Sequence, residues 1–310
     1  MDGWVMSPLD RDQPAGRVLA LVLESHLEEF RSREGPVRSG EDAEDLHRYR
    51  VVLRRTRSLL SAGGSVYPAE ELELLSAMTA HLAALTSPVR DLDVLLEHLD
   101  DGVALVTPQL HGGAEALRAQ LVDTRARARA QLIEELDGEF SEVLVRRWQA
   151  MASVYRVGGT ESGPDVRRPA GEVVDAMILA SFKRLRRQGR RARRSSVDVE
   201  WHRLRKRVKR FRYLLSAFED LYEPATFAKV ISELADLQDG LGELQDHVAE
   251  AGHLIVAGEA VGGRGALLAG ALVDRLDAAT PGARRHCRHA WDRFDRPKVR
   301  RHLREALAGS

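Results

Sequence analysis

The sequence predicts an all-α protein made of two similar helical bundles, and three observations support this. Aromatic residues make up only 5% of the 310 residues, and the abundant Ala, Leu, Arg and Glu favour helices over strands. Apolar residues recur at the helical spacing between segments rich in turn residues. A shift of 155 residues aligns the second half of the chain with the first. We therefore expect two pseudo-symmetric antiparallel helical bundles related by an internal repeat.

The repeat keeps one register over most of the chain. The shift places the Pro-Ala-Gly triplet at 14–16 on the same triplet at 169–171, and it places His47 on His202. The two copies of Leu-Leu-Ser-Ala coincide as well. Between the halves, the segment GGTESGPDVRR has the Gly, Ser and Pro content of a linker. The resulting division is a tail at 1–13, a first repeat at 14–157, a linker at 158–168 and a second repeat at 169–310.

Turn signals set the order of the helices in the first repeat. One helix follows the Pro-Ala-Gly triplet, and the next ends before the segment AGGSVYP. The segment LTSP separates the third helix from the fourth, and LHGG precedes the fifth. The second repeat is expected to follow the same order with shorter late members. The expected helices of the first repeat span 15–33, 42–62, 68–85, 88–101, 113–137 and 139–155.

The charge of the chain is separated rather than absent. Lys and Arg balance Asp and Glu at 47 each. Between residues 183 and 212, however, fifteen cations stand against two acids, whereas 219–259 holds ten acids and one Lys. A cationic surface beside acidic helices indicates a polyanionic partner despite the neutral total.

The single cysteine and the apolar segments indicate the compartment. Cys287 cannot form an internal disulfide, and no Cys-pair metal spacing is present, which is typical of a reducing interior. The N-terminal residues lack the basic and apolar regions of a secretory signal. Glu259 and Arg264 interrupt the most apolar late stretch, so it is not expected to span a membrane. We expect a cytoplasmic protein.

Each repeat carries a basic helix whose cations form a stripe beside an apolar seam. The seam residues are Leu46, Tyr49, Leu53, Thr56 and Leu60 in the first repeat and Trp201, Leu204, Val208, Phe211 and Leu215 in the second. At 100° per residue, the cations centre roughly 90° from the seam. These paired stripes consist of His47, Arg50, Arg54 and Arg57, and of His202, Arg205, Lys209 and Arg212.

Like charges on one helix face repel, so an anionic group should compensate them. Arg outnumbers Lys on the paired stripes, which suits bidentate binding of phosphate oxygens. The preceding helix of the second repeat adds further cations, including Arg186 and Arg190. Together these residues exceed what nearby acids can neutralise, which favours an extended polyanion.

The basic helices resemble those of the CHAD family, the conserved histidine α-helical domain. The pattern H-R-x-R-x-x-x-[RK]-R-x-R-x-L-L occurs twice, followed by RDLDVLLEHL in the first half and LADLQDGLGELQDHV in the second. The resemblance covers almost the whole chain. It implies two helical bundles around a basic central cavity and binding of inorganic polyphosphate, often at polyphosphate granules, without catalysis or a cofactor.

By this resemblance the paired stripes become the expected polyphosphate-contacting set, and Arg186 and Arg190 are added to it from the preceding helix. The family is often fused to a CYTH triphosphatase-type domain, and we expect this chain to be a stand-alone CHAD protein instead. Asp93 has Val248 at its repeat position and Arg90 has Gln245, so the acidic segment is not symmetric and is left out of the set.

Three alternatives compete with this interpretation. The first is internal pairing of the stripes with the protein's own acids, Asp91, Asp93, Asp236, Asp239, Glu243 and Asp246. The second is nucleic-acid binding, which would add aromatic stacking platforms, although Tyr49, Trp201, Phe211 and Tyr213 mostly follow the core period. The third is a metal-dependent phosphohydrolase using Glu44-x-x-His47 or Glu250-x-x-His253. Neither of these pairs recurs in the other repeat, and no nucleotide-binding loop is present.

Overall fold

The structure, a computed structural model that describes residues 9–156 and 163–308, is all-α as predicted. Within those ranges no β-strand forms, and the one extended contact is an isolated bridge between Pro14 and Pro169. The first half contains α1 (Ala15–Ser39), α2 (Ala43–Ala62), α3 (Ala69–Ala104), the 3-10 helix η1 (Pro108–Gly113), α4 (Ala114–Asp137) and α5 (Glu139–Arg156). The second half contains α6 (Ala170–Arg194), α7 (Asp198–Ala217), the 3-10 helix η2 (Glu219–Leu221), α8 (Pro224–Gly240), α9 (Gly242–Val261), α10 (Gly263–Phe294) and α11 (Pro297–Ala308).

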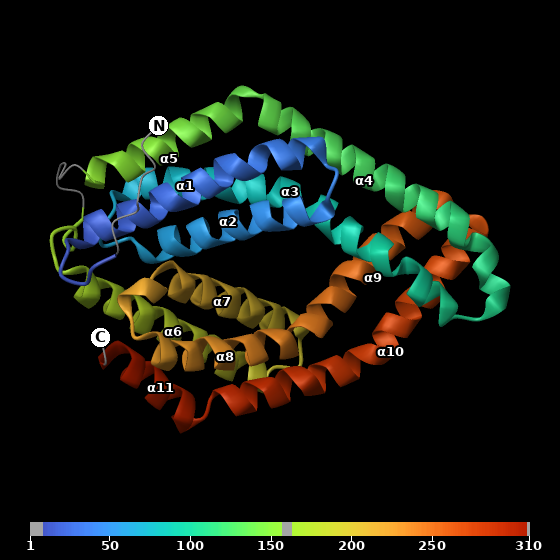
Figure 1. Ribbon diagram of the computed structural model, residues 1–310. Helices are drawn as coiled ribbons and strands as arrows, with labels where there is room; N and C mark the ends of the chain where they lie inside the picture. Colours follow the sequence, from blue (N-terminus) through green and yellow to red (C-terminus); the bar gives the residue numbers. More distant parts are fainter. Residues whose placement is uncertain (1–8, 157–162, 309–310) are drawn as a thin grey trace.

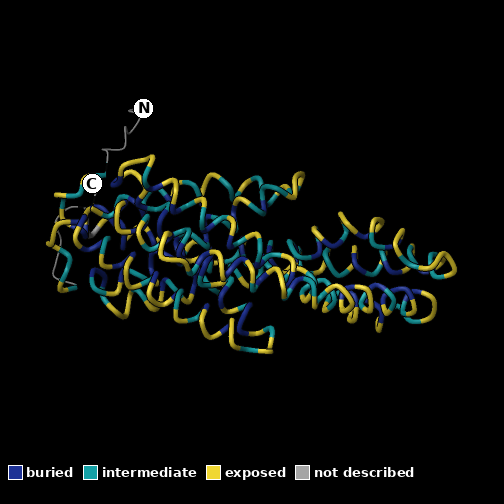
Figure 2. The backbone as a smooth tube through the Cα atoms, turned by 90° about the horizontal axis from the view of Figure 1, so that it is seen from below, coloured by how far each residue is buried: buried dark blue, intermediate teal, exposed yellow. Residues whose placement is uncertain are grey.

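The helices form two bundles that meet along α2 and α7, with an arm extending from one end. In Figure 1, α1, α2, α3 and α5 lie on one side, and α6, α7, α8 and α11 on the other. One apolar core runs through both bundles. A second, smaller core fills the arm, where Leu99 of α3 and Leu121 of α4 join Leu254 of α9 and Leu272 of α10. Figure 2 shows this arm as the narrower end of the molecule.

The starts of the two halves pair with each other. Ala15 N donates to Arg168 O at 2.8 Å, and Ala170 N donates to Gln13 O at 2.8 Å. The first backbone N–H groups of a helix have no partner within the helix, so this exchange satisfies one donor at each start. Arg11 also forms an ion pair with Asp175 of α6 at 2.8 Å. The last residues of the expected tail therefore hold the two helix starts together.

The expected break before Pro88 is wrong, because residues 69–104 form the single helix α3. Proline removes one helical hydrogen bond but can be tolerated when side chains hold the turn before it. Here Thr86 Oγ1 and Ser87 Oγ each donate to Ala83 O at 2.9 Å. The segment that looked like a turn is thus an internal turn of a long helix, and it lies beside α2.

The expectation of shorter late helices in the second half holds for α11 but not for α10. With 32 residues, α10 is longer than α4, which has 24. The counterpart of α3 is divided at Leu241 into α8 and α9. Gly240 packs so closely on α10 that an added Cβ would lie 2.4 Å from the Cβ of Ala290. Among the described residues, no helix is long and apolar enough to cross a membrane.

Candidate anion-binding site

The apolar seams of the two basic helices are buried as predicted. All ten seam residues of α2 and α7 are nearly or fully inaccessible, among them Tyr49 and Phe211. Burying the seams orients the neighbouring cationic faces, and α2 and α7 pack against each other. The paired stripes therefore lie on adjacent helices at the junction of the two bundles (Figure 1).

On α2, the stripe is held mainly by uncharged acceptors. Arg50 Nη1 donates to Thr86 Oγ1 at 3.0 Å and to Ser87 Oγ at 2.9 Å, both on α3. Arg54 Nε donates to Arg50 O at 3.2 Å. These bonds orient the guanidinium groups without neutralising them, because hydroxyl and carbonyl oxygens carry no net charge. The charge of the stripe remains available to an anion.

On α7, the contacts reach α8 and α9. Arg205 Nη2 forms an ion pair with Asp246 Oδ1 at 3.0 Å, and Arg212 Nη1 donates to Gln238 Oε1 at 3.2 Å. The Nδ1 atom of His202 donates to Gln245 Oε1. His202, Arg205 and Arg212 are thus each positioned by a side chain of α8 or α9.

The electrostatics of Lys209 show that the two stripes act on each other. Burial lowers the pKa of Lys209 to about 7, and the neighbouring guanidinium groups of Arg205, Arg54 and Arg50 contribute. Two of these neighbours belong to α2, in the other bundle. Burial and the charge of Arg54 likewise lower the pKa of Arg50 to about 10. Four cations from two helices therefore act on one another where water screens them poorly.

The two histidines are less readily protonated than the sequence suggests. Burial lowers the pKa of His47, and the nearby Arg54, Arg90 and Arg50 oppose its protonation. Burial also lowers the pKa of His202, together with Lys206, Arg205 and Lys209. Both imidazoles are therefore mostly neutral near pH 7 in the free protein, and among the members of the paired stripes Lys209 has a pKa close to neutrality.

Internal pairing with acids accounts for little of the stripe charge. Of the six candidate acids, Asp246 pairs with a stripe cation, whereas Asp93 pairs with Arg125 on α4 and Glu243 with His286 on α10. Within the described ranges, Arg50, Arg54, Arg57, Lys209 and Arg212 have no carboxylate at ion-pair distance. Asp91 and Asp246 still attract Arg50 and Lys209 from beyond that distance, so most of the stripe cations lack a directly paired counterion but are not wholly uncompensated.

The structure does not bring Arg186 and Arg190 to the paired stripes. Both lie on α6 and pair with Asp295, which follows α10, at 2.6 and 3.2 Å. They line a cavity of about 910 Å³ between α6 and α11. Phe182, Leu185 and Gly189 turn inward, whereas Arg186 and Arg190, four residues apart on one face of the helix, reach Asp295 at the end of α10.

Sequence reasoning missed several side chains that position the stripes. Arg90, which affects the pKa of His47, and Gln245, which contacts His202, stand at equivalent repeat positions beside equivalent histidines. Their different side chains led to their exclusion, although the shared register was a usable signal. Thr86, Ser87 and Gln238 carry no comparable sequence signal. Over the described ranges, no cluster of three or more His, Cys, Asp or Glu side chains could hold a metal ion.

We expect replacement of Lys209 by methionine to stabilise the protein. Methionine keeps the length of the side chain and removes a desolvated cation from beside Arg205, Arg54 and Arg50. The free energy of unfolding in urea should rise by about 1–2 kcal/mol near pH 7. A lysine whose pKa is lowered on folding destabilises the native state fully below about pH 7, and this cost disappears as the pH rises to about 10.5. The gain should therefore shrink at alkaline pH, and a loss of stability at pH 7 would contradict this account.

The fold and the facing basic helices define an all-helical domain with a cationic site between two bundles. Residues 21–255 match the CHAD domain, so the chain belongs to the CHAD domain family. The crystal structure of the CHAD domain from the plant Ricinus communis has a TM-score of 0.72 and 23% identity, covering 93% of this chain and 94% of that one. PptA from Streptomyces chartreusis has a TM-score of 0.72 and 17% identity, covering 90% and 99%. These similarities show the shared fold.

Two curated relatives are uncharacterized proteins from two strains of Mycobacterium tuberculosis. Each is 28% identical over 229 residues, which is 69% of this chain. The matched region spans 40% of the length of those relatives.

Proposed function

We propose that this protein binds inorganic polyphosphate between α2 and α7 and does not hydrolyse it. The observation that carries the proposal is the convergence of the paired stripes, where Arg50 and Arg54 of one bundle lower the pKa of Lys209 in the other. A chain of phosphates would relieve this repulsion along its length, with charge-assisted hydrogen bonds from each guanidinium group. The CHAD family resemblance favours the same ligand, and we place the protein in the cytoplasm at polyphosphate granules.

The burial of the aromatic residues in the seams favours polyphosphate over nucleic acid as the ligand. Single-stranded nucleic acids are usually bound by stacking their bases on exposed aromatic rings. Tyr49, Trp201 and Phe211, the aromatic residues of the seams, are each at most 2% exposed. A ligand in this site would meet guanidinium, ammonium and imidazole groups, no ring from the seams and one half-buried ring, Tyr213, which acts on Arg50. A single half-buried ring is less than the stacking platform that a run of bases needs, which favours phosphate without bases.

We expect long-chain polyphosphate to bind much more tightly than tripolyphosphate, because linked phosphates contact several cations at high effective concentration. Calorimetric titration should show a difference of at least about a hundredfold, and a weaker response to single-stranded RNA of equal charge. If the five stripe arginines and Lys209, protonated in the complex, all contact phosphate, the logarithm of the affinity should fall with the logarithm of salt concentration with a slope of about −4.

The same samples distinguish a binding protein from an enzyme. Free phosphate measured over several hours, with and without Mg²⁺, should remain at the level of the protein-free control. Phosphate release that follows protein concentration would overturn the non-catalytic assignment. Equal affinity for RNA and polyphosphate would overturn the ligand assignment.

A further inference from the structure

The cavity between α6 and α11 occupies a place that a helix fills in the other bundle. In the first half, α5 lies along α1: Trp148 Nε1 donates to Leu23 O at 2.9 Å, and the ring centroids of Phe30 and Trp148 are 5.3 Å apart. The 155-residue shift places Leu303 of α11 where α5 has Trp148. In the second half, however, α11 packs against α8 instead of along α6.

Two features of α11 explain its different position. It has 12 residues where α5 has 18. Lys298 and His302 of α11 also reach Glu233 of α8, at 3.6 and 3.9 Å. Among the described residues, no helix covers the exposed face of α6, and the groove follows this face from Leu179 to Arg194, about 22 Å at the helical rise of 1.5 Å per residue.

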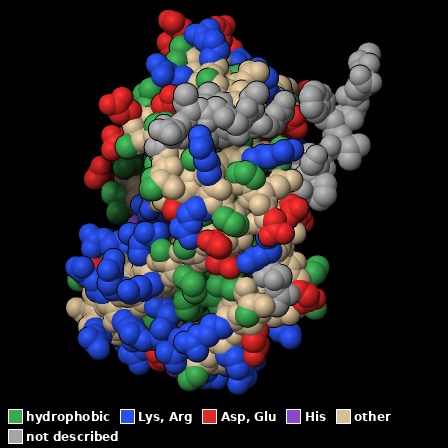
Figure 3. Space-filling model, turned by 90° about the vertical axis from the view of Figure 1, so that its left-hand side faces the viewer, with side chains coloured by type: hydrophobic (Ala, Val, Ile, Leu, Met, Phe, Trp, Pro, Cys, Tyr) green, Lys and Arg blue, Asp and Glu red, His purple; other side chains and the backbone are tan. Residues whose placement is uncertain are grey.

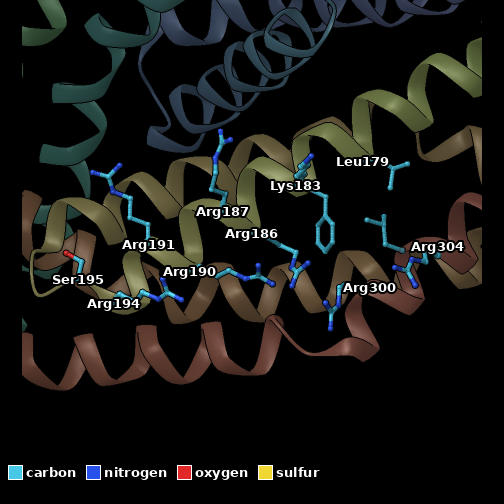
Figure 4. Close-up of a pocket in the computed structure, with 12 residues that line it drawn as sticks. Leu179, Lys183, Arg186, Arg187, Arg190, Arg191, Arg194, Ser195, Arg300 and Arg304 are labelled. Carbon is cyan, nitrogen blue, oxygen red and sulfur yellow. The ribbon is translucent and has the colours of Figure 1, made fainter.

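The groove combines an apolar floor with a cationic rim. Leu179, Phe182 and Leu303 form the floor, and Leu179 is 47% exposed. Eight Lys and Arg residues and no acid line the groove (Figure 4). Within the described ranges, five of them have no carboxylate at ion-pair distance: Lys183, Arg187, Arg194, Arg300 and Arg304. Figure 3 views the molecule from the left-hand side of Figure 1 and shows Lys and Arg side chains gathered around apolar side chains in its lower part.

This combination selects among anionic ligands. Polyphosphate has no apolar part, so it would leave the exposed Leu179 uncovered. A flat lipid bilayer would not reach the floor of a concave groove between two helices. Phe182 packs against Phe211 and Phe294, with ring centroids 5.6 and 6.1 Å away, and is only 8% exposed, so it offers no face for a nucleotide base. A helix with one apolar and one acidic face satisfies both the floor and the rim.

We propose that the groove between α6 and α11 binds an acidic amphipathic helix of a partner protein, placed along α6 as α5 is placed along α1. Its apolar residues cover Leu179, and its Glu and Asp residues pair with the cations of the rim. This site is separate from the paired stripes, so a protein partner and polyphosphate can be bound together.

Fluorescence anisotropy with a designed peptide tests the proposal. The probe is a labelled helix of 18 residues, the length of α5, with Leu on one face and Glu on the other, and a scrambled peptide of equal composition is the comparison. We expect saturable binding that weakens about tenfold in Leu179→Ser, because about one buried Leu side chain is lost. Leu179 is largely exposed, so this variant should fold, and circular dichroism checks that it does.

Charge-reversal variants locate the site. Lys183→Glu/Arg187→Glu should abolish peptide binding, whereas Arg184→Glu/Arg301→Glu, on exposed positions of the same helices outside the groove, should retain it. Arg54→Glu/Lys209→Glu should also retain it. Equal binding of the scrambled peptide, no effect of Leu179→Ser, or loss in either control would overturn the proposal. A dimer that sedimentation experiments detect in the wild type but not in Lys183→Glu/Arg187→Glu would also overturn it, because the occupant of the groove would then be a second copy of the chain.

Discussion

Replacement of both Arg54 and Lys209 by glutamate should reduce the affinity for long-chain polyphosphate by at least about a hundredfold. Each substitution removes a cation that would bind phosphate, and one comes from each bundle. A hydrogen bond to a charged group contributes about 1.5–3 kcal/mol, so two such losses already amount to a hundredfold or more. The new carboxylates would also repel the ligand. Calorimetric titration at one fixed salt concentration measures the effect.

A matched control separates the site from the general charge of the molecule. Arg48→Glu/Arg203→Glu makes the same change of charge on the same two helices, at exposed and equivalent repeat positions outside the stripes. We expect less than about a threefold loss, as for screened surface charges. Equal losses in both double variants would show that polyphosphate responds to net charge alone. An unchanged affinity in Arg54→Glu/Lys209→Glu would place the ligand elsewhere.

Polyphosphate affinity should rise as the pH falls from about 9 to 7, by up to about tenfold for each pH unit. In the free protein the pKa of Lys209 is about 7, because burial and Arg205 and Arg54 disfavour the ammonium form. Bound phosphate favours the ammonium form and raises the pKa of Lys209. Binding therefore takes up a proton at any pH between the pKa of the free protein and that of the complex. Below about pH 7 the contribution of Lys209 is complete, and only the two histidines, whose pKa values are lowered, add to the increase.

Titration in two buffers with different ionisation enthalpies measures this proton uptake directly. The variant Lys209→Arg is the decisive comparison, since arginine stays protonated throughout this range. It should bind well at pH 9 and lose most of the pH dependence. An affinity that is independent of pH in the wild type, or a profile that is unchanged in Lys209→Arg, would contradict the role given to Lys209.

The helices could be predicted where local chemistry decides them. The bounds of α2 follow from a capping Asp42, whose side chain accepts from Glu44 N at 2.8 Å, and from Gly63 at its end. The seam of α2 could be predicted for a similar reason, because the helical period places the apolar residues on one face. The break expected at Pro88 does not occur, because Thr86 and Ser87 hold the helical turn before the proline. The same two side chains are in turn held by Arg50 of the neighbouring helix α2. No local signal reports that contact.

The helical fold class, the register of the two basic helices and the membership of the paired stripes could all be predicted from the order of the amino acids. These properties depend on periodicity and residue type, which are local. Only the tertiary structure decided that Arg54 and Lys209 act on each other, and that Arg186 and Arg190 line a separate groove beside α11. The charge of a side chain is written in the sequence, but its solvation and its neighbours from other helices arise only when the bundles pack, and these set its pKa and its availability to a ligand.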